Sequence, residues 1–158
     1  MSEIELNKKQ EFRANITEFE NQVSNMEGSM HGELKDYFNP LKHTFADGLY
    51  IREVFMPAGQ IIVTKIHKVE HPIFIMKGHV SIMTEDGLDE IKAPYQGITK
   101  PGTKRIIYTH EDTILITVHA TDKKTPEEVE EDVIAKNFDD PVISIQEINL
   151  LKNIQWVL

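Results

Sequence analysis

The chain has 158 residues, of which 40% are hydrophobic and 27% charged, an ordinary composition for one globular domain with a buried core. Its formal net charge is −9, and no cluster of Lys and Arg occurs, which argues against nucleic acid as a partner because phosphate contacts need a basic face. The absence of cysteine excludes disulfides, thiolate zinc sites and cysteine nucleophiles, so any metal must be bound by His, Asp or Glu.

The apolar runs of the sequence are short. None approaches the roughly 18 residues that a membrane helix requires, and the first ten residues lack the apolar stretch of a secretory signal. We therefore expect no membrane partner and a cytoplasmic location.

Residues 1–45 are polar and predict an N-terminal helix followed by irregular chain. Apolar residues recur there at spacings of three and four, which places them on one side of a helix. They are Phe12, Ile16, Phe19, Val23 and Met26. Gly28 should end the helix, and Gly32 and Pro40 should keep the next stretch irregular. We expect this apolar stripe to pack on the β-rich region or on its copy in a homo-oligomer; a loose arm that binds a partner is the alternative.

Residues 46–122 contain eight short β-rich runs separated by turn residues. Crossover helices do not fit between so many runs in about 70 residues, which excludes βαβ winding and leaves an antiparallel closed barrel or double-sheet jelly roll. Four glycines should lie in the turns. They are Gly59, Gly78, Gly87 and Gly102.

Residues 123–158 predict a C-terminal helix and an apolar tail. Thr125 can cap a helix over residues 125–138, and Pro126 suits its first position. The tail that contains Trp156 is apolar almost to its end, so we expect it to dock on the N-terminal helix or on a neighbouring subunit.

Three histidines of the β-rich region could bind one metal ion. His67 and His71 flank a three-residue segment, and His119 ends a later run. Four residues of a straight strand span about 13 Å, so His67 and His71 can share an ion only if residues 68–70 turn the chain back. Two surface histidines on a connecting loop are the alternative. Imidazole ligands would favour a divalent transition metal such as Fe, Zn, Ni or Mn over Ca²⁺.

Three basic residues lie in predicted strands whose alternate residues face the interior. They are Arg52, Lys65 and Arg105. Buried cations need anions or hydrogen-bond acceptors, so an interior lined by two of them would suit a carboxylate, a sugar phosphate or a nucleotide. Outward-facing charges on polar strand faces are the alternative.

The segment from Gly59 to Gly78 resembles the first conserved motif of the cupins, Gly-x5-His-x-His-x3-4-Glu-x6-Gly. Counted back from Gly78, the Glu position falls on His71, the second His position on His67 and the first His position on Lys65. Histidine in place of the motif's glutamate is chemically tolerable, since three-histidine iron cupins exist.

The segment ITKPGTKRIIY resembles the second cupin motif, Pro-x-Gly-x2-His. Gly102 matches, whereas Lys100 stands in the Pro position and Arg105 stands where the histidine belongs. The similarity covers roughly residues 48–120 and is specific for the fold rather than for the ligand set, because one of the four ligand positions keeps its usual residue. More narrowly, the region resembles small cupin-like proteins found in bacteriophage genomes, which indicates a bacterial or phage origin.

The resemblance implies a mainly β, cupin-like small jelly-roll barrel with an N-terminal helix and a C-terminal helix plus tail. The barrel would hold a divalent metal on His67, His71 and His119, or a small polar or anionic molecule near Lys65 and Arg105. Three functions are compatible with that fold, which does not choose among them. They are a metal-dependent enzyme on a small substrate, a non-catalytic binding protein, and an oligomeric structural protein of phage origin.

Overall fold

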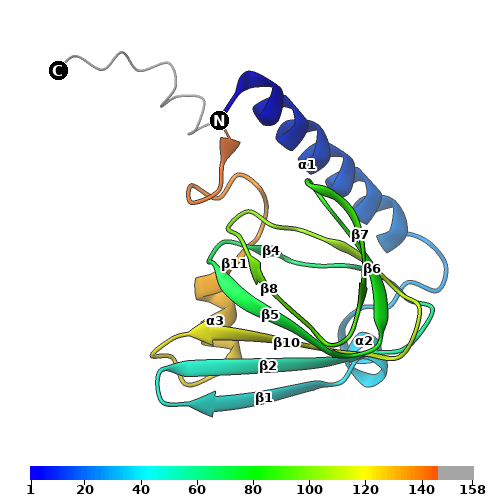
Figure 1. Ribbon diagram of the computed structural model, residues 1–158, viewed down its shortest axis with the longest axis vertical. Coiled ribbons are helices and arrows are strands. Elements are labelled where there is room, and N and C mark those ends of the chain that lie inside the picture. The colour runs from blue at the N-terminus through cyan, green and yellow to red at the C-terminus, as the bar shows by residue number, and fades with distance from the viewer. Residues whose placement is uncertain (146–158) are drawn as a thin grey trace.

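The computed structural model describes residues 1–145, and they form a mainly β structure with helices around it (Figure 1). The helices are α1 (Glu3–Ser24), α2 (Gly32–Phe38) and α3 (Pro126–Val133). The strands are β1 (Leu41–Ala46), β2 (Leu49–Met56), β3 (Ile61–Val63), β4 (Ile66–His67), β5 (His71–Lys77), β6 (His79–Thr84), β7 (Gly87–Lys92), β8 (Tyr95–Thr99), β9 (Ile106–Thr109), β10 (Thr113–Ala120) and β11 (Ile134–Ala135). None of the helices in this part of the chain is long and apolar enough to cross a membrane.

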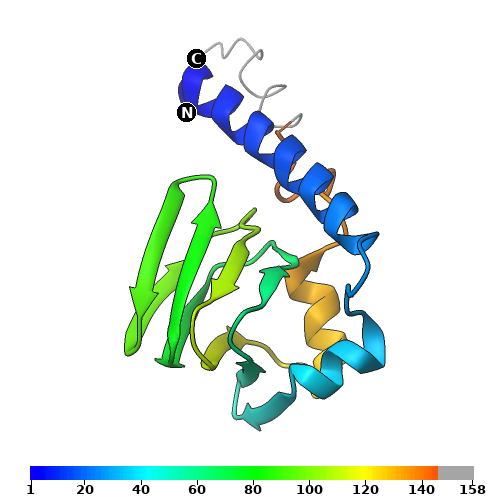
Figure 2. The same cartoon turned by 90° about the vertical axis from the view of Figure 1, so that its right-hand side faces the viewer.

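Two antiparallel sheets face each other across a shared interior, as Figures 1 and 2 show. The larger sheet has the strand order β1-β2-β10-β5-β8, and the smaller has the order β3-β9-β6-β7. Strand β11 of the C-terminal segment pairs with β4 and so joins that segment to the barrel. Every pairing is antiparallel, so the predicted jelly-roll barrel is confirmed.

The four predicted turn glycines all adopt positive φ between or beside strands, as expected. Gly78, between β5 and β6, shows why no other residue suits its position. Its φ is 103°, and a Cβ there would lie 2.4 Å from Oγ1 of Thr113 and 2.7 Å from the carbonyl oxygen of Asp112. The chain can therefore pass this close to the start of β10 only without a side chain.

One half of the barrel interior is an apolar core. Side chains from both sheets meet in it, because alternate residues of each strand point inward. The buried members are Met56, Ile73, Ile75, Val80, Ile82, Ile107 and Leu115. The other half of the interior is polar and is described below.

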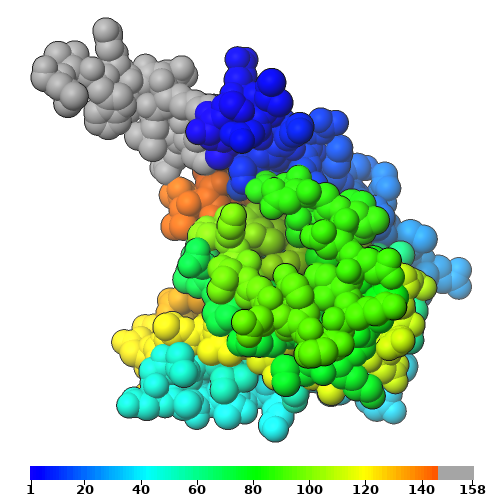
Figure 3. Space-filling model, in the orientation of Figure 1, coloured from blue at the N-terminus to red at the C-terminus, as the bar shows by residue number. Residues whose placement is uncertain are grey.

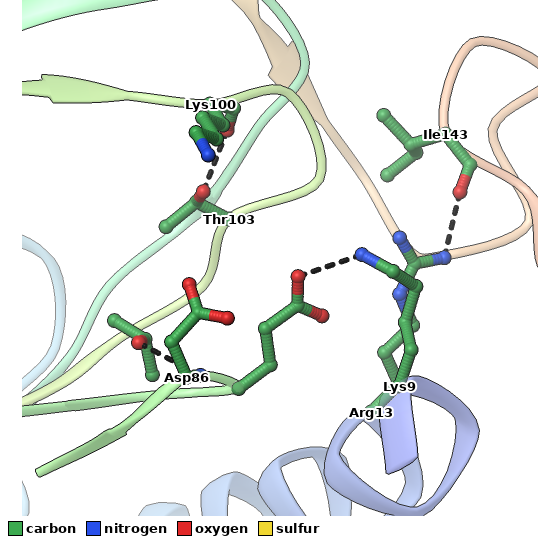
Figure 4. A network of polar contacts seen from close by, with 8 residues as sticks. Lys9, Arg13, Asp86, Lys100, Thr103 and Ile143 are labelled. Carbon is green, nitrogen blue, oxygen red and sulfur yellow. Dashed lines mark hydrogen bonds and ion pairs between the residues drawn. The ribbon is translucent and has the colours of Figure 1, made fainter. Parts of the chain in front are cut away.

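Helix α1 lies across one end of the barrel, where Figure 3 shows it as a ridge over the β6–β7 hairpin. Lys9 pairs with Glu85 in the hairpin turn at 2.7 Å. Arg13 is buried and donates from Nη1 to the carbonyl oxygen of Ile143 at 2.6 Å (Figure 4). Its guanidinium also stacks over the ring of Phe138. The helix is thus tied both to the smaller sheet and to the C-terminal segment.

The apolar stripe of α1 is only partly as predicted. Ile16 is buried, whereas Phe12 and Phe19 are half-buried. The helix ends at Ser24, before Gly28, so Met26 lies outside it and is 62% exposed. Trp156, expected to be buried as well, lies outside the described residues.

The chain between α1 and β2 is more regular than expected. Helix α2 and strand β1 occupy it, and Pro40 separates the two. Proline disfavours helix at the residue before it, which is consistent with the end of α2 at Phe38. Strand β1 then pairs with β2 along its whole length. Asp47 and Gly48 form the two-residue turn between them, and Gly48 has a positive φ of 71°. Asp-Gly is a local hairpin signal that the expectation of irregular chain overlooked.

Helix α3 begins as predicted and ends earlier. The side chain of Thr125 accepts a hydrogen bond from the backbone N–H of Glu128, and Pro126 is the first helical residue. The expected range 125–138 is wrong at its end, because the helix stops at Val133 and Ile134–Ala135 pair with β4 instead. Backbone pairing with the barrel replaces the last turns of the helix.

Candidate metal and anion site

The polar half of the barrel interior is built by the register of four neighbouring strands. His119 of β10 lies opposite Tyr50 of β2, and His71 of β5 lies opposite Thr99 of β8. One step deeper, Thr117 lies opposite Arg52. Beyond that row the inward residues are apolar, so the polar side chains occupy one end of the barrel. The end of β4 and helix α3 lie beside it (Figure 1).

The structure brings the three candidate histidines together. The ring centroids of His71 and His119 are 4.3 Å apart, those of His67 and His71 are 4.6 Å apart, and those of His67 and His119 are 6.5 Å apart. His67 ends β4 and His71 starts β5, so residues 68–70 turn the chain between them. The middle ring of the group is His71, which is 3% exposed.

Each of the three rings has a buried nitrogen without a hydrogen-bond partner among residues 1–145. These atoms are Nε2 of His71 and Nδ1 of His67 and of His119. Nδ1 of His71 lies 2.9 Å from the carbonyl oxygen of Val69. Because a carbonyl can only accept, this Nδ1 carries the proton and Nε2 presents a bare lone pair. Buried polar atoms normally have partners, and these three nitrogens are the ones in the group that no protein atom of residues 1–145 occupies.

The environment keeps these imidazoles neutral. Burial lowers the pKa of His67 to about 2 and that of His119 to about 4, and in both cases the nearby His71 lowers it further. Burial also lowers the pKa of His71, and Arg105 adds to the effect. The neutral ring is the form that binds metal ions, so all three histidines are ready to ligate at neutral pH.

The separations of the rings are compatible with one shared ion. A ligating nitrogen lies about 2.1 Å from the metal, so its ring centre is about 3.2 Å away and two such rings are at most about 6.5 Å apart. All three measured separations satisfy this limit. Within residues 1–145, no group of three or more His, Asp or Glu side chains already has its donors arranged around one point. An ion would therefore require the rings to turn toward it.

Two arginines adjoin the histidines. Arg105 is 8% exposed and donates from Nη2 to Oγ1 of Thr99 at 2.6 Å. Arg52 is half-buried and lies opposite Thr117. Burial lowers the pKa of both guanidinium groups, but arginine remains charged at neutral pH. No Asp or Glu of the described chain forms an ion pair with either one.

No protein-family model matches the sequence, and no curated protein matches it. Solved structures do match. The DMSP lyase DddQ from Ruegeria pomeroyi DSS-3 is similar with a TM-score of 0.50 and 18% identity, over 63% of this chain and 55% of that chain. A cupin-2 domain protein from Shewanella frigidimarina matches 65% of this chain and 92% of its own, at 10% identity and a TM-score of 0.43. The cupin domain of Cnp3 from Schizosaccharomyces pombe matches 65% and 70%, at 20% identity and a TM-score of 0.45. The fold is that of a cupin.

Three of the four residues at the ligand positions of the cupin motifs lie in this site, and one does not. His67, His71 and Arg105 reach the polar half of the barrel, whereas Lys65 does not belong to it. The side chain of Lys65 is more than half exposed and pairs with Glu130 of α3. The prediction that Lys65 faces the interior is wrong, because the expected single strand breaks between β3 and β4 and the inward-outward alternation does not continue across the break.

Sequence reasoning missed other polar residues of the cupin interior. The hydroxyl of Tyr50 lies 2.5 Å from Nδ1 of His43, and the ring of Tyr50 stacks on His119. Thr99 and Thr117 are both buried. Thr117 and His119 share the inward alternation of the run TILITVH, where polar residues among apolar ones could have marked the site.

Proposed function

We propose that this cupin binds one divalent transition metal ion through His67, His71 and His119 and acts as a metal-dependent enzyme on a small polar substrate. The observation that supports it is the group of three adjacent, neutral imidazoles, of which His71 and His119 are buried and His67 is half-buried, each with a buried nitrogen that has no partner among residues 1–145. Fe, Zn, Ni and Mn are the candidate ions, since imidazole donors favour transition metals over Mg²⁺ and Ca²⁺.

The protein prepares the ligand nitrogens before an ion arrives. The carbonyl oxygen of Val69 fixes the tautomer of His71 and leaves Nε2 free for the metal, as is usual for ligating histidines. The ring of Tyr50 lies nearly parallel to that of His119, with the centroids 6.2 Å apart. Three protein ligands leave coordination positions open, where a bound ion would act as a Lewis acid on a substrate.

The kinds of polar side chain around the three histidines decide which groups could transfer a proton in a reaction. None of the buried side chains of residues 1–145 is a carboxylate, and the buried polar residues next to the histidines are Arg105, Thr99 and Thr117. Tyr50, whose pKa is raised by burial, would supply a neutral hydroxyl that can donate a hydrogen bond. Lyase, isomerase and oxygenase chemistry on a small molecule are the reactions that we propose to test. The lyase activity named for the Ruegeria protein is that protein's own.

The metal content of protein purified without a His-tag tests the proposal. We expect one equivalent of a transition metal in the wild type, and its loss in His71→Ala with the fold retained, because the ligand lies in a preformed barrel. The matched control is His110→Ala, since His110 is exposed and its Nε2 contacts the hydroxyl of Ser81 instead. Wild-type protein that takes up no stoichiometric Fe, Zn, Ni or Mn, even after incubation with each, would refute the proposal.

We also propose that the chain forms a homo-oligomer through the outer face of the larger sheet. The outward residues of β5 and β10 are largely apolar, and two exposed apolar residues lie on this face, Met76 of β5 at 57% and Ile98 of the edge strand β8 at 60%. Phe74 lies opposite Ile116 on this face, and Pro72 lies opposite Ile98. Apolar sheet faces of this kind usually mark an interface. This assembly would also serve the structural role that a phage origin allows.

A further inference from the structure

We infer that Arg52 and Arg105 form a binding site for the oxyanion group, carboxylate or phosphate, of the molecule on which this cupin acts. The inference deepens the proposed function, because it rests on the same polar half of the barrel and names the chemical class of the ligand beside the three histidines.

The first argument is the balance of charge in the barrel interior. Two guanidinium groups are buried or half-buried there, although the chain as a whole carries a net charge of −9. Neither forms an ion pair with a carboxylate among residues 1–145. The neighbouring imidazoles are neutral and supply no negative charge. Among residues 1–145, none of the nitrogens of Arg52 and Arg105 is a fully buried atom without a partner, so their free N–H groups are accessible to a small molecule. A partly desolvated cation binds an anion favourably, which supports an anion as the ligand.

The second argument is geometric. Arg52 belongs to β2 of the larger sheet, whereas Arg105 immediately precedes β9 of the smaller sheet and its backbone N–H bonds to Oγ1 of Thr64. The two side chains therefore come from different sheets of the barrel. Nη2 of Arg105 reaches across to Thr99, the cross-strand partner of His71. Both guanidinium charges lower the pKa of His67, so both act on the same ring. An anion beside the histidines would therefore lie between the two arginines.

The third argument is the donor capacity that remains. The described chain provides one side-chain hydrogen bond for Arg105, through Nη2, and none for Arg52. A guanidinium has five N–H donors in a planar fork that matches the two oxygens of a carboxylate or phosphate.

Calorimetric titration of the full chain, freed of metal with EDTA and then dialysed, tests the inference. The probes are inorganic phosphate and malonate, which distinguish phosphate from carboxylate as the preferred group. We expect one-to-one binding of at least one probe, and a loss of affinity of about tenfold or more in Arg52→Gln and in Arg105→Gln, as for other charge-assisted hydrogen bonds. Lys124→Gln is the control, because Lys124 is exposed and this substitution removes one positive charge at a position away from the site. Its affinity should equal that of the wild type.

Either of two results would overturn the inference: neither probe binds saturably, or both arginine variants bind as the wild type does. If the variants fail to fold, NMR of the wild type decides, since a bound probe must shift the ring resonances of His71 and His119. Metal content is measured separately on the same proteins. Arg105→Gln should keep its metal while losing the anion, and metal-free His71→Ala should keep the anion, so the failure of one proposal is distinguishable from the failure of the other.

Discussion

Replacing His71 with leucine should abolish metal binding without lowering the stability of the metal-free protein. His71 is 3% exposed, and its Nε2 is buried without a partner among the described residues. A buried, unsatisfied polar atom costs about 1–3 kcal/mol, and leucine removes it at similar volume. The substitution also removes the hydrogen bond from Nδ1 to the carbonyl oxygen of Val69, which is worth about 1 kcal/mol. Val69 is exposed, so water can donate a hydrogen bond to that carbonyl instead. The free energy of unfolding should therefore stay the same or rise by up to about 2 kcal/mol.

Urea unfolding in EDTA at pH 7.5 measures this difference, with His110→Leu as the control. His110 is exposed, so its replacement should change the free energy of unfolding by no more than about 0.5 kcal/mol. With metal added, the wild type should gain stability in proportion to the logarithm of the metal concentration, and His71→Leu should gain none. A loss of more than about 2 kcal/mol in metal-free His71→Leu would show that His71 is a structural residue, and the reasoning would be wrong.

Two further predictions concern pH and assembly. The metal-free protein should lose stability as the pH falls below about 6.5, because unfolded histidines take up protons there. In the folded chain, burial delays protonation to about pH 4 for His119 and about pH 2 for His67. Urea unfolding at several pH values checks this, and a free energy of unfolding unchanged between pH 7.5 and pH 5 would contradict it. For assembly, light scattering should find an oligomer that the double variant Met76→Lys/Ile98→Lys converts to a monomer, whereas Leu88→Lys on the smaller sheet should not; a monomeric wild type would end that proposal.

The fold was predictable because its signals are local. Short β-rich runs and turn residues such as Gly59 and Gly78 follow one another along residues 48–120, and each signal depends on a few neighbouring residues. Strand β1 was missed although Asp47 and Gly48, the two residues that join it to β2, are a local hairpin signal. The pairing of β2 with β10 is different, because it joins residues far apart in the sequence and no local pattern contains its register.

The site was predictable in its members and not in its geometry. His67 and His71 could be named from their positions around a turn, but their convergence depends on a bend at residues 68–70 and on the register of β5 with β10. Lys65 shows where this reasoning fails: side chains alternate between the two faces of a sheet within one strand, but the alternation does not continue across a break between two strands. Tyr50 needed the pairing of β2 with β10 before it could be placed beside His119.

The loop between β8 and β9 connects helix α1 to the site. Arg13 of the helix packs so closely on Gly102 that a Cβ there would lie 2.8 Å from its Nη2. Glu20 of the helix pairs with Lys104, the neighbour of Arg105, and Gly102 donates its N–H to the carbonyl oxygen of His67 at 2.7 Å. A molecule that lifted α1 from the barrel would thus displace the loop that holds both the proposed metal-binding residue His67 and the proposed anion-binding residue Arg105, and would change the site from outside without occupying it.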